Sequence, residues 1–348
     1  MSGEGNLRVE ENLGEGYVRL RVSEAERRQA KHDIQHVEDI VIEMLRNARD
    51  AGADKVYLAT TKEDGVRTLV FLDNGSGVPQ DMQERIFDAR VTSKLESMKM
   101  DRWGVHGRGM ALFSIKQNTD EACVVASDVD LGSVFKVSVA TDRLGERADQ
   151  SSWPQAVKDE DGHYVCARGP HNIIRAACEF ALEELRACDV YLGSPSEIAA
   201  TLHAQASSRL DASRLLFIDD EAELPVVDRL GLASDAEDFI RICSGLGLEM
   251  SERTAHRILA GQIKPVRGVT ARLLRERDSS SHASAPVDLA KDRRGLRIAK
   301  DDMAQFSRAV ERDFNDLASR YYLNLCGDPK IRVSRDRITV TFDLAKEE

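Results

Sequence analysis

The sequence predicts an α/β domain that is followed by a mainly helical region ending in a β-hairpin. In the first part, apolar residues recur with a helical period from Ile34 to Ala51, and Gly52 is placed to end that helix. Four later stretches, KVYLATT, RTLVFLDNG, EACVVASDV and GSVFKVSVA, have the apolar and β-branched content of strands. The alternating stretch YVRLRVS predicts another strand before the helix. At the far end, KIRVSRDRITVTFDL predicts two strands that turn at Arg335-Asp336.

Changes in composition divide the chain into segments. Helix and strand signals alternate in the first, and a polar linker or hairpin follows it. The third segment has helical spacing, including residues 170–190 and 195–210. A serine-rich linker then precedes a long predicted helix, 301–325, whose apolar stripe is typical of packing or dimerisation. The segments are 15–145, 146–169, 170–277, 278–290 and 291–348, and the stripe consists of Phe306, Val310, Phe314, Leu317 and Tyr321.

Composition limits the classes of function. The chain has 348 residues, and none of its apolar runs approaches the roughly 18 residues of a membrane span, so no membrane partner is expected. The start of the sequence lacks the features of a signal peptide, and the 6 cysteines form no CxxC pair. These observations favour a cytoplasmic setting. A net charge of -11 excludes nucleic-acid binding by the whole surface, although residues 251–277 carry a local excess of Lys and Arg.

The stretch VIEMLRNARDAGA places an acid, an amide and a second acid in one column of the predicted helix. Glu43, Asn47 and Asp50 stand at i, i+4 and i+7, which brings them to the same face. The flanking Asp39 and Arg46 are expected to face water. A solvated polar face is the alternative interpretation of the column.

Two glycine-containing runs could contact a ligand. Asp73 ends a predicted strand, where its carboxylate can accept a hydrogen bond from an exocyclic amine. Gly75 and Gly77 follow it, and their lack of side chains lets a flat ring approach the backbone. The glycine-rich run at 104–109 precedes the predicted helix MALFSIKQN, so its N–H groups can bind an anion. Either run by itself is more often an ordinary turn or loop.

The order of these segments is more specific than any one of them. The chain contains, in this order, an ExxxNAxDA helix, a strand ending in DNGxG, a polar stretch, a Gly-rich loop opening a helix and a strand beginning Gly132-Ser133. In this order the segments resemble the GHKL family over roughly residues 15–142. This family includes DNA gyrase, the heat-shock chaperones, histidine kinases and MutL mismatch-repair proteins. The stretches that look most like MutL are EMLRNARDAGADKVYL, DNGSGVPQDM and VTSKL. GRGMALFSIKQ is closer to the histidine-kinase loop, and DRWGVHGRGMALFS is similar to the topoisomerase VI B subunit.

The resemblance implies a Bergerat α/β sandwich, in which helices pack on one face of a mixed sheet and ATP binds between the helices and a flexible lid. By the same resemblance, Asn47 binds the Mg2+ that bridges the phosphates, Glu43 is the general base, and Asp73 binds adenine. Ser133 would share a water with Asp73, and Asp50 would brace the helix or the lid. The implied ATP-binding residues are Asn47, Asp50, Asp73, Gly75, Gly77, Val78, Thr92, Ser93, Lys94, Gly104, Val105, His106, Gly107, Arg108, Gly109, Met110 and Ser133.

The implied function is Mg-dependent ATP hydrolysis that drives a lid or dimerisation switch, with a homodimer and DNA or a DNA-associated protein as partners. The glycine run departs from MutL, which has GFRGEAL there, and Arg108 adds a cation to it. A histidine- or serine-kinase-like phosphotransferase is one alternative, although no phosphoacceptor helix pair precedes the domain. A regulatory protein that senses ATP without hydrolysing it is the other.

Residues 247–266, GLEMSERTAHRILAGQIKPV, resemble a helix-turn-helix. Ser251 is placed to cap a helix that could enter a DNA major groove, and the local basic excess favours contact with phosphates. The alternative is a helical bundle with a basic solvated face. The helix would present Arg253, Thr254, His256 and Arg257, of which Arg253 and Arg257 are the expected DNA contacts.

Overall fold

The chain divides into two compact units, Met1–Ser279 and Ser280–Glu348. None of the helices in the part that the structure describes is long and apolar enough to cross a membrane. The structure is a computed structural model, and it describes residues 9–93, 99–106, 109–210, 218, 220–274, 303, 306–307, 310–311, 314, 323–325, 329–333, 338–342 and 344–346.

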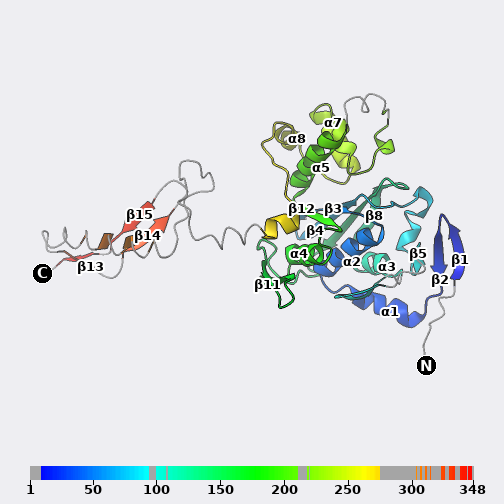
Figure 1. The fold of residues 1–348 in the computed structure, drawn as a ribbon, viewed down its shortest axis with the longest axis horizontal. Coiled ribbons are helices and arrows are strands. Elements are labelled where there is room, and N and C mark those ends of the chain that lie inside the picture. Colours follow the sequence, from blue (N-terminus) through cyan, green and yellow to red (C-terminus); the bar gives the residue numbers. More distant parts are fainter. Residues whose placement is uncertain are drawn as a thin grey trace. The chain divides into compact units, whose positions relative to one another are not determined.

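The first unit is built around a five-stranded mixed sheet (Figure 1). Its strands are β3 Lys55–Glu63, β4 Val66–Asp73, β8 Glu121–Ser127, β9 Ser133–Ala140 and β12 Asp189–Gly193. Their order across the sheet is β12-β3-β4-β9-β8. β12 runs parallel to β3, and the other neighbours are antiparallel. The four strands that the sequence predicts between residues 55 and 140 are therefore all present, and they form the centre and one edge of this sheet.

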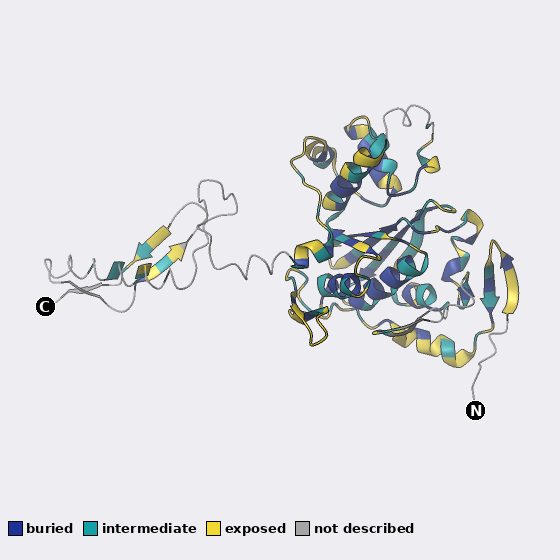
Figure 2. Cartoon of the chain, viewed as in Figure 1, coloured by how far each residue is buried: buried dark blue, intermediate teal, exposed yellow. Residues whose placement is uncertain are grey.

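Helices cover both faces of the sheet, and their buried sides are turned toward it (Figure 2). They are α2 Val37–Asp50, α3 Ala111–Asn118, α4 Ile173–Glu183, α5 Pro195–Arg209, α7 Ala236–Gly245 and α8 Glu252–Leu259, whereas α1 Glu24–Asp33 packs against α3. α2, α3 and α4 contribute to the core on one face, whereas α5, α7 and α8 contribute to the core on the other.

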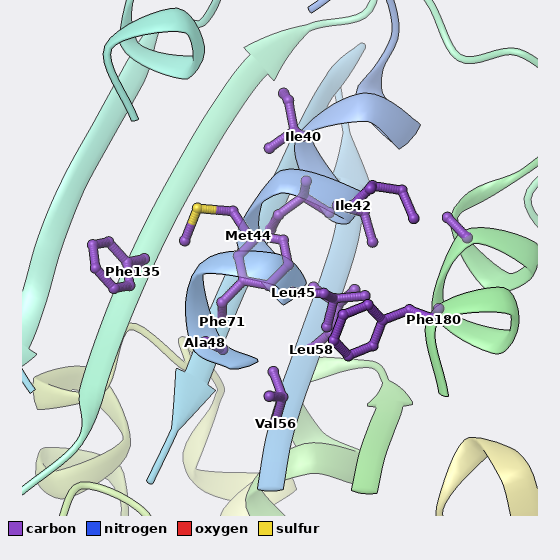
Figure 3. Close-up of a cluster of buried hydrophobic side chains, with 14 of the residues drawn as sticks. Ile40, Ile42, Met44, Leu45, Ala48, Val56, Leu58, Phe71, Phe135 and Phe180 are labelled. Carbon is purple, nitrogen blue, oxygen red and sulfur yellow. The ribbon is translucent and has the colours of Figure 1, made fainter. Parts of the chain in front are cut away.

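α2 forms because its apolar residues repeat every three to four positions, which gives one continuous stripe. Val41, Met44, Leu45 and Ala48 on this stripe are all buried against the sheet. Figure 3 shows Met44 and Leu45 of the helix among strand residues such as Phe71, with Phe180 of α4 beside them. The apolar stripe thus fixes which side of α2 remains for the polar column.

The sheet can carry two cores because its central strands are apolar at successive positions. Leu58 and Phe71 belong to the core shared with α2, whereas their neighbours Tyr57 and Leu72 belong to the core shared with α5 and α7. Successive side chains of a strand point to opposite faces, so continuous apolar runs require cover on both sides. Helical cover on two faces is thus a consequence of strand composition.

The predicted Bergerat-type sandwich is confirmed: the helices of the N-terminal α/β region lie on one face of a mixed sheet, and a mainly helical region and a hairpin follow. The structure adds that the helical region packs on the other face of the same sheet. It also corrects the helix predicted at 170–190. α4 ends at Glu183, and the chain then enters β12, which extends the sheet beside β3. The apolar residues of β12 could not be assigned by period because five residues are too few.

Smaller elements surround the sheet. The segment expected as a linker or hairpin contains a hairpin, β10–β11. A second hairpin, β6–β7, joins the end of the polar stretch to the first residues of the glycine-rich run. β1, β2 and β5 form a three-stranded sheet. The bounds are β1 Val9–Gly14, β2 Tyr17–Leu20, β5 Val91–Thr92, β6 Lys99–Asp101, β7 Gly104–His106, β10 Gln155–Lys158, β11 Tyr164–Arg168, and the 3-10 turns η1 Gln80–Met82, η2 Arg85–Phe87, η3 Glu221–Glu223 and η4 Arg229–Leu232.

The second unit contains the predicted hairpin. β14 Lys330–Val333 pairs antiparallel with β15 Ile338–Thr341, and β13 Leu323–Leu325 pairs with β16 Leu344–Lys346. Of the helix predicted at 301–325, the described positions from 303 to 314 are helical, but the last three residues belong to β13. Pairing with a distant strand decides the conformation there. Leu317 and Tyr321 of the predicted stripe lie outside the described residues.

Candidate functional site

A cavity of about 430 Å³ is bounded by α2, by β4 and β9, and by the start of α3. Its size falls in the range of about 300 to 1,000 Å³ that is usual for small-molecule sites. The residue types lining it are mixed, with apolar walls and a few polar side chains. The sequence-predicted site residues that line it are Glu43, Asn47, Asp50, Asp73, Gly77, Val78, Thr92, Ser93, Gly109, Met110 and Ser133.

Asp73 lies at the end of β4 and is only 4% exposed. The backbone N–H of Gly75 donates to Asp73 Oδ1 at 2.8 Å, which fixes the carboxylate. Ser133 is the neighbour of Asp73 across the sheet, and its hydroxyl lies 3.0 Å from that of Ser127. Ser127 in turn accepts from the backbone N–H of Val78 at 2.8 Å. The carboxylate therefore sits in a buried, hydrogen-bonded corner of the cavity.

Two glycines are required by the backbone around this corner. Gly77 has a φ of +71°, and a Cβ there would lie 1.8 Å from the carbonyl oxygen of Asp128. Gly132 has a φ of +78°, and a Cβ there would lie 2.1 Å from the carbonyl oxygen of Asp73. Both values are far below van der Waals contact. These glycines thus let the turn after β4 and the turn between β8 and β9 approach each other beside Asp73, in addition to any role in ligand approach.

The polar column of α2 does face the cavity. Glu43, Asn47 and Asp50 all line it, so the spacing correctly placed them on one side of the helix. The Asn47 side-chain nitrogen, Nδ2, is buried and has no hydrogen-bond partner within the described part of the chain. A buried amide without a partner is unfavourable by about 1 to 3 kcal/mol, so this group favours a ligand that would contact it.

Arg46 does not face water, contrary to the expectation. It is 2% exposed, and its guanidinium donates from Nη1 to Glu43 Oε1 at 2.7 Å. The same guanidinium donates from Nε and Nη2 to the two carboxylate oxygens of Asp101, at 2.9 and 3.0 Å. Asp101 comes from β6, far along the sequence, and it compensates the charge that burial would otherwise destabilise. The helical period alone could not reveal this because the partner is not on the helix.

A second buried arginine extends the ionic cluster to Asp50. Arg49 donates from Nε to Asp50 Oδ1 at 3.0 Å and from Nη1 to Asp101 and Glu184, at 3.2 and 3.1 Å. Burial opposes the charge of Arg49, but Asp50 and the other two carboxylates outweigh it and raise the pKa of the guanidinium. The Asp50 side chain is 5% exposed. Its contact with Arg49 is of the bracing kind that the resemblance implies for it.

The first residues of the glycine-rich run form a strand and not the expected loop. Gly104–His106 form the strand β7, which pairs with β6, and Gly107 and Arg108 lie outside the described residues, as does Lys94. Gly109 has a φ of +67° and leads through Met110 into α3. Among the residues that the structure describes, no side chain caps the first turn of α3, and this turn lines the cavity. Its N–H groups are therefore available to an anion.

Several cavity residues were not selected from the sequence. Phe71 and Phe135 form apolar walls, and their strand positions could have identified the cavity-facing side by the two-residue period. Tyr17 comes from β2, and burial raises the pKa of its phenol although a hydrogen bond with Ser93 opposes the shift. Trp103 comes from the turn of the β6–β7 hairpin. Its contribution depends on tertiary placement, and no local pattern indicates it.

The side chains at the cavity fit Mg2+ only as part of a nucleotide complex. Among the described residues, no group of three or more His, Cys, Asp or Glu side chains could hold a metal ion. Mg2+ often takes one or two protein ligands and fills its other positions with phosphate oxygens and water. The side chain of Asn47 could supply one oxygen, so a nucleotide would have to bring most of the coordination.

Residues 34–130 match a family model described as histidine kinase-, DNA gyrase B-, and HSP90-like ATPase. This range runs from α2 through β8, and so covers most of the residues that line the cavity. A DNA mismatch repair protein MutL from Pediococcus pentosaceus is 30% identical over 115 residues, which are 32% of this chain and 17% of that protein. The match is thus confined to one part of each chain.

The glycine geometry gives a first prediction. Gly132→Ala should lower the free energy of unfolding by about 1 to 3 kcal/mol, since it combines an unfavourable φ with a backbone clash at Asp73. Urea unfolding followed by circular dichroism measures this. Gly145→Ala is the matched control, because a Cβ there meets nothing within 4 Å and its φ is not positive. Equal stability of the two variants would show that the close approach at Gly132 is not a constraint.

Proposed function

The N-terminal domain of this chain belongs to the GHKL superfamily of ATPases and resembles MutL, and on this premise we propose that the protein binds ATP with Mg2+ in the cavity and hydrolyses it. One observation carries the proposal. A buried carboxylate, Asp73, an unpartnered amide, Asn47, and the uncapped start of α3 share a single cavity. Asp73 suits the amine of a base, and the donors at Asn47 Nδ2 and at the start of α3 suit phosphate oxygens, while the Asn47 oxygen could contact the ion on the phosphate chain.

At one end of the cavity, Asp73 would accept a hydrogen bond from the adenine amine. Its carboxylate is already oriented by the Gly75 N–H, so little freedom is lost when the base binds. The apolar Phe71 and Phe135 supply walls for a flat ring. A guanine base carries a carbonyl oxygen where adenine has its amine, and a carboxylate there would repel it.

At the other end, the N–H groups of the first turn of α3 would bind phosphate oxygens, together with the backbone at Gly109. Asn47 would contact Mg2+, which neutralises charge on the phosphates when bound. Glu43 lies one helical turn before Asn47 on the same face, within reach of a water beside the terminal phosphate. Glu43 would take a proton as the water oxygen bonds to phosphorus, while the bond to the ADP oxygen breaks.

We further propose that ATP binding orders the lid and biases a conformational or dimerisation switch, with hydrolysis as the reset. The protein would act in DNA-associated processes by analogy with MutL. The relative is a DNA mismatch repair protein, but the match covers only 17% of its length, so this part rests on the analogy.

Replacement of the base should separate binding from turnover. Glu43→Gln should bind ATP within about twofold of wild type and lower kcat by about 100-fold or more, since it keeps the shape of the side chain but cannot accept the proton. Isothermal titration and a single-turnover assay with labelled γ-phosphate measure the two quantities.

The control for this experiment is Glu63→Gln, an exposed position on β3. Hydrolysis by Glu43→Gln at the wild-type rate would show that Glu43 is not the base. The same assay tests the alternatives, because label on the protein indicates a phosphotransferase, and ATP binding without release or transfer of label indicates a sensor.

Replacement of the adenine contact should act on affinity. Asp73→Asn should weaken ATP binding by about 10- to 100-fold, as expected for the loss of a hydrogen bond to a charged group. Asp64→Asn is the control, because Asp64 is exposed at the opposite end of β4 in a turn with a φ of 48° that asparagine adopts readily. Unchanged affinity in Asp73→Asn would contradict the adenine assignment.

A second candidate function, duplex DNA binding, is favoured by the surface of α8. Ser251 caps this helix by accepting from the Thr254 N–H, as the sequence predicts. Arg253, His256 and Arg257 are exposed while the opposite side is buried. The partner helix in the structure is α7, which ends at Gly245, so only the second helix of the pair falls within the predicted 247–266. We propose that this basic face contacts phosphates.

The charge-reversal variant Arg253→Glu/Arg257→Glu should abolish the binding of a labelled duplex at low salt. Wild type should lose affinity steeply as salt rises, because phosphate contacts release counterions. Fluorescence anisotropy measures both. Arg27→Glu/Arg28→Glu on the exposed side of α1 is the control with the same charge change. Wild type that binds no duplex at low salt would rule out this function, whatever the result for ATP.

A further inference from the structure

We propose that Asp101, on the β6–β7 hairpin, is a positioning residue for hydrolysis and acts on Glu43 through Arg46. The inference rests on the proposed function, since it concerns the same carboxylate. It makes the docked hairpin a requirement for turnover and not for nucleotide binding.

The three side chains form a continuous chain of contacts. Arg46 lies in the middle, with 3% of its side chain exposed. Its Nη1 donates to Glu43 at 2.7 Å, and its Nε and Nη2 donate to the two oxygens of Asp101 at 2.9 and 3.0 Å. Asp101 therefore occupies the Nε–Nη2 edge of the guanidinium through two parallel hydrogen bonds. Glu43 receives a donor from the remaining nitrogen.

This division of donors suits Glu43 as a base. An arginine binds a carboxylate most strongly through two parallel hydrogen bonds, and such a pair would hold Glu43 as a fixed counterion. Asp101 takes Nε and Nη2 in such a pair, which leaves Nη1 of Arg46 to orient Glu43. Loss of Asp101 would let the guanidinium turn its two-donor edge toward Glu43, which would then be displaced from the water and weakened as a proton acceptor.

Asp101 is itself held in place by the hairpin and by α2. The backbone N–H of Trp103 donates to Asp101 Oδ1 at 3.0 Å, and Arg49 donates to Oδ2 at 3.2 Å. The indole of Trp103 stacks on Phe180 of α4, with the ring centres 6.3 Å apart. The carboxylate is 7% exposed. Movement of the hairpin away from α2 and α4 would therefore withdraw Asp101 from Arg46.

The hairpin turn also borders the space around Glu43. A second cavity of about 240 Å³ lies beside the first, and Glu43 and Trp103 line both. A carboxylate that borders two cavities can be reached by water while the larger one holds a ligand. The docked turn thus controls the orientation of Glu43 and forms part of the wall beside it.

The test is a comparison of kcat with affinity in Asp101→Asn. This substitution keeps the size of the side chain but removes its charge. We expect kcat to fall by about 10- to 100-fold, the range for small displacements of a reacting group, with the Kd for ATP within about twofold of wild type. Asp64→Asn is the control, because it makes the same chemical change at an exposed turn that does not contact the hairpin or α4.

A double-substitution cycle separates positioning from general destabilisation. If Asp101 acts through Arg46, Arg46→Gln/Asp101→Asn should have a kcat within about twofold of Arg46→Gln alone. Multiplied effects would overturn the inference, as would an unchanged kcat or a Kd that rises in parallel with the loss of kcat. In these cases wild type still hydrolyses ATP and Glu43→Gln does not, so the proposed function stands. Wild type without hydrolysis would overturn both.

Discussion

The packing of α2 against the five-stranded sheet is the constraint on which the site depends. The apolar stripe of the helix, including Val41, Leu45 and Ala48, is buried against β3 and β4, and this fixes the rotation of the helix about its axis. Glu43 and Asn47 lie on the opposite side of the helix and therefore face the cavity. The same sheet ends β4 at Asp73, so one packing arrangement places the residues at both ends of the proposed ATP site. Groups on rigid elements are held more accurately than groups on loops.

A buried ionic cluster lies beside the polar column of α2 and also fixes the positions of its side chains. Arg46 and Arg49 bring two positive charges beneath the polar column, and carboxylates from α2, from the β6–β7 hairpin and from α4 surround them. Buried ion pairs are poor evidence for stability, because desolvation offsets much of their attraction. They do specify geometry, since each charge must find its partner. The cluster therefore accounts for the docking of the hairpin on α2 and connects the N-terminal α/β region to α4.

Structural features that local sequence patterns determine could be predicted, and features that depend on distant segments could not. Period, composition and capping act within a few residues. They therefore predicted the strands β3, β4, β8 and β9, the helices α2 and α3, and the cap at Ser251. The short strand β12 and the strand end of the predicted 301–325 helix were not predicted, since distant pairing decides them. Arg46 illustrates the same limit at the site: its sequence neighbours suggested an exposed charge, but Asp101, 55 positions away, allows its burial.

By itself, the sequence determined the α/β class, the side of α2 that carries Glu43, Asn47 and Asp50, and the place of Asp73 at a strand end. These follow from side-chain periodicity, which is fixed by backbone geometry. Only the tertiary structure decided that the sheet is covered on both faces, that Arg46 is shared between two carboxylates, and that Gly132 must lack a side chain beside Asp73. The physical reason is that burial, ion pairing and close backbone approach are properties of segments brought together by folding, which no local pattern encodes.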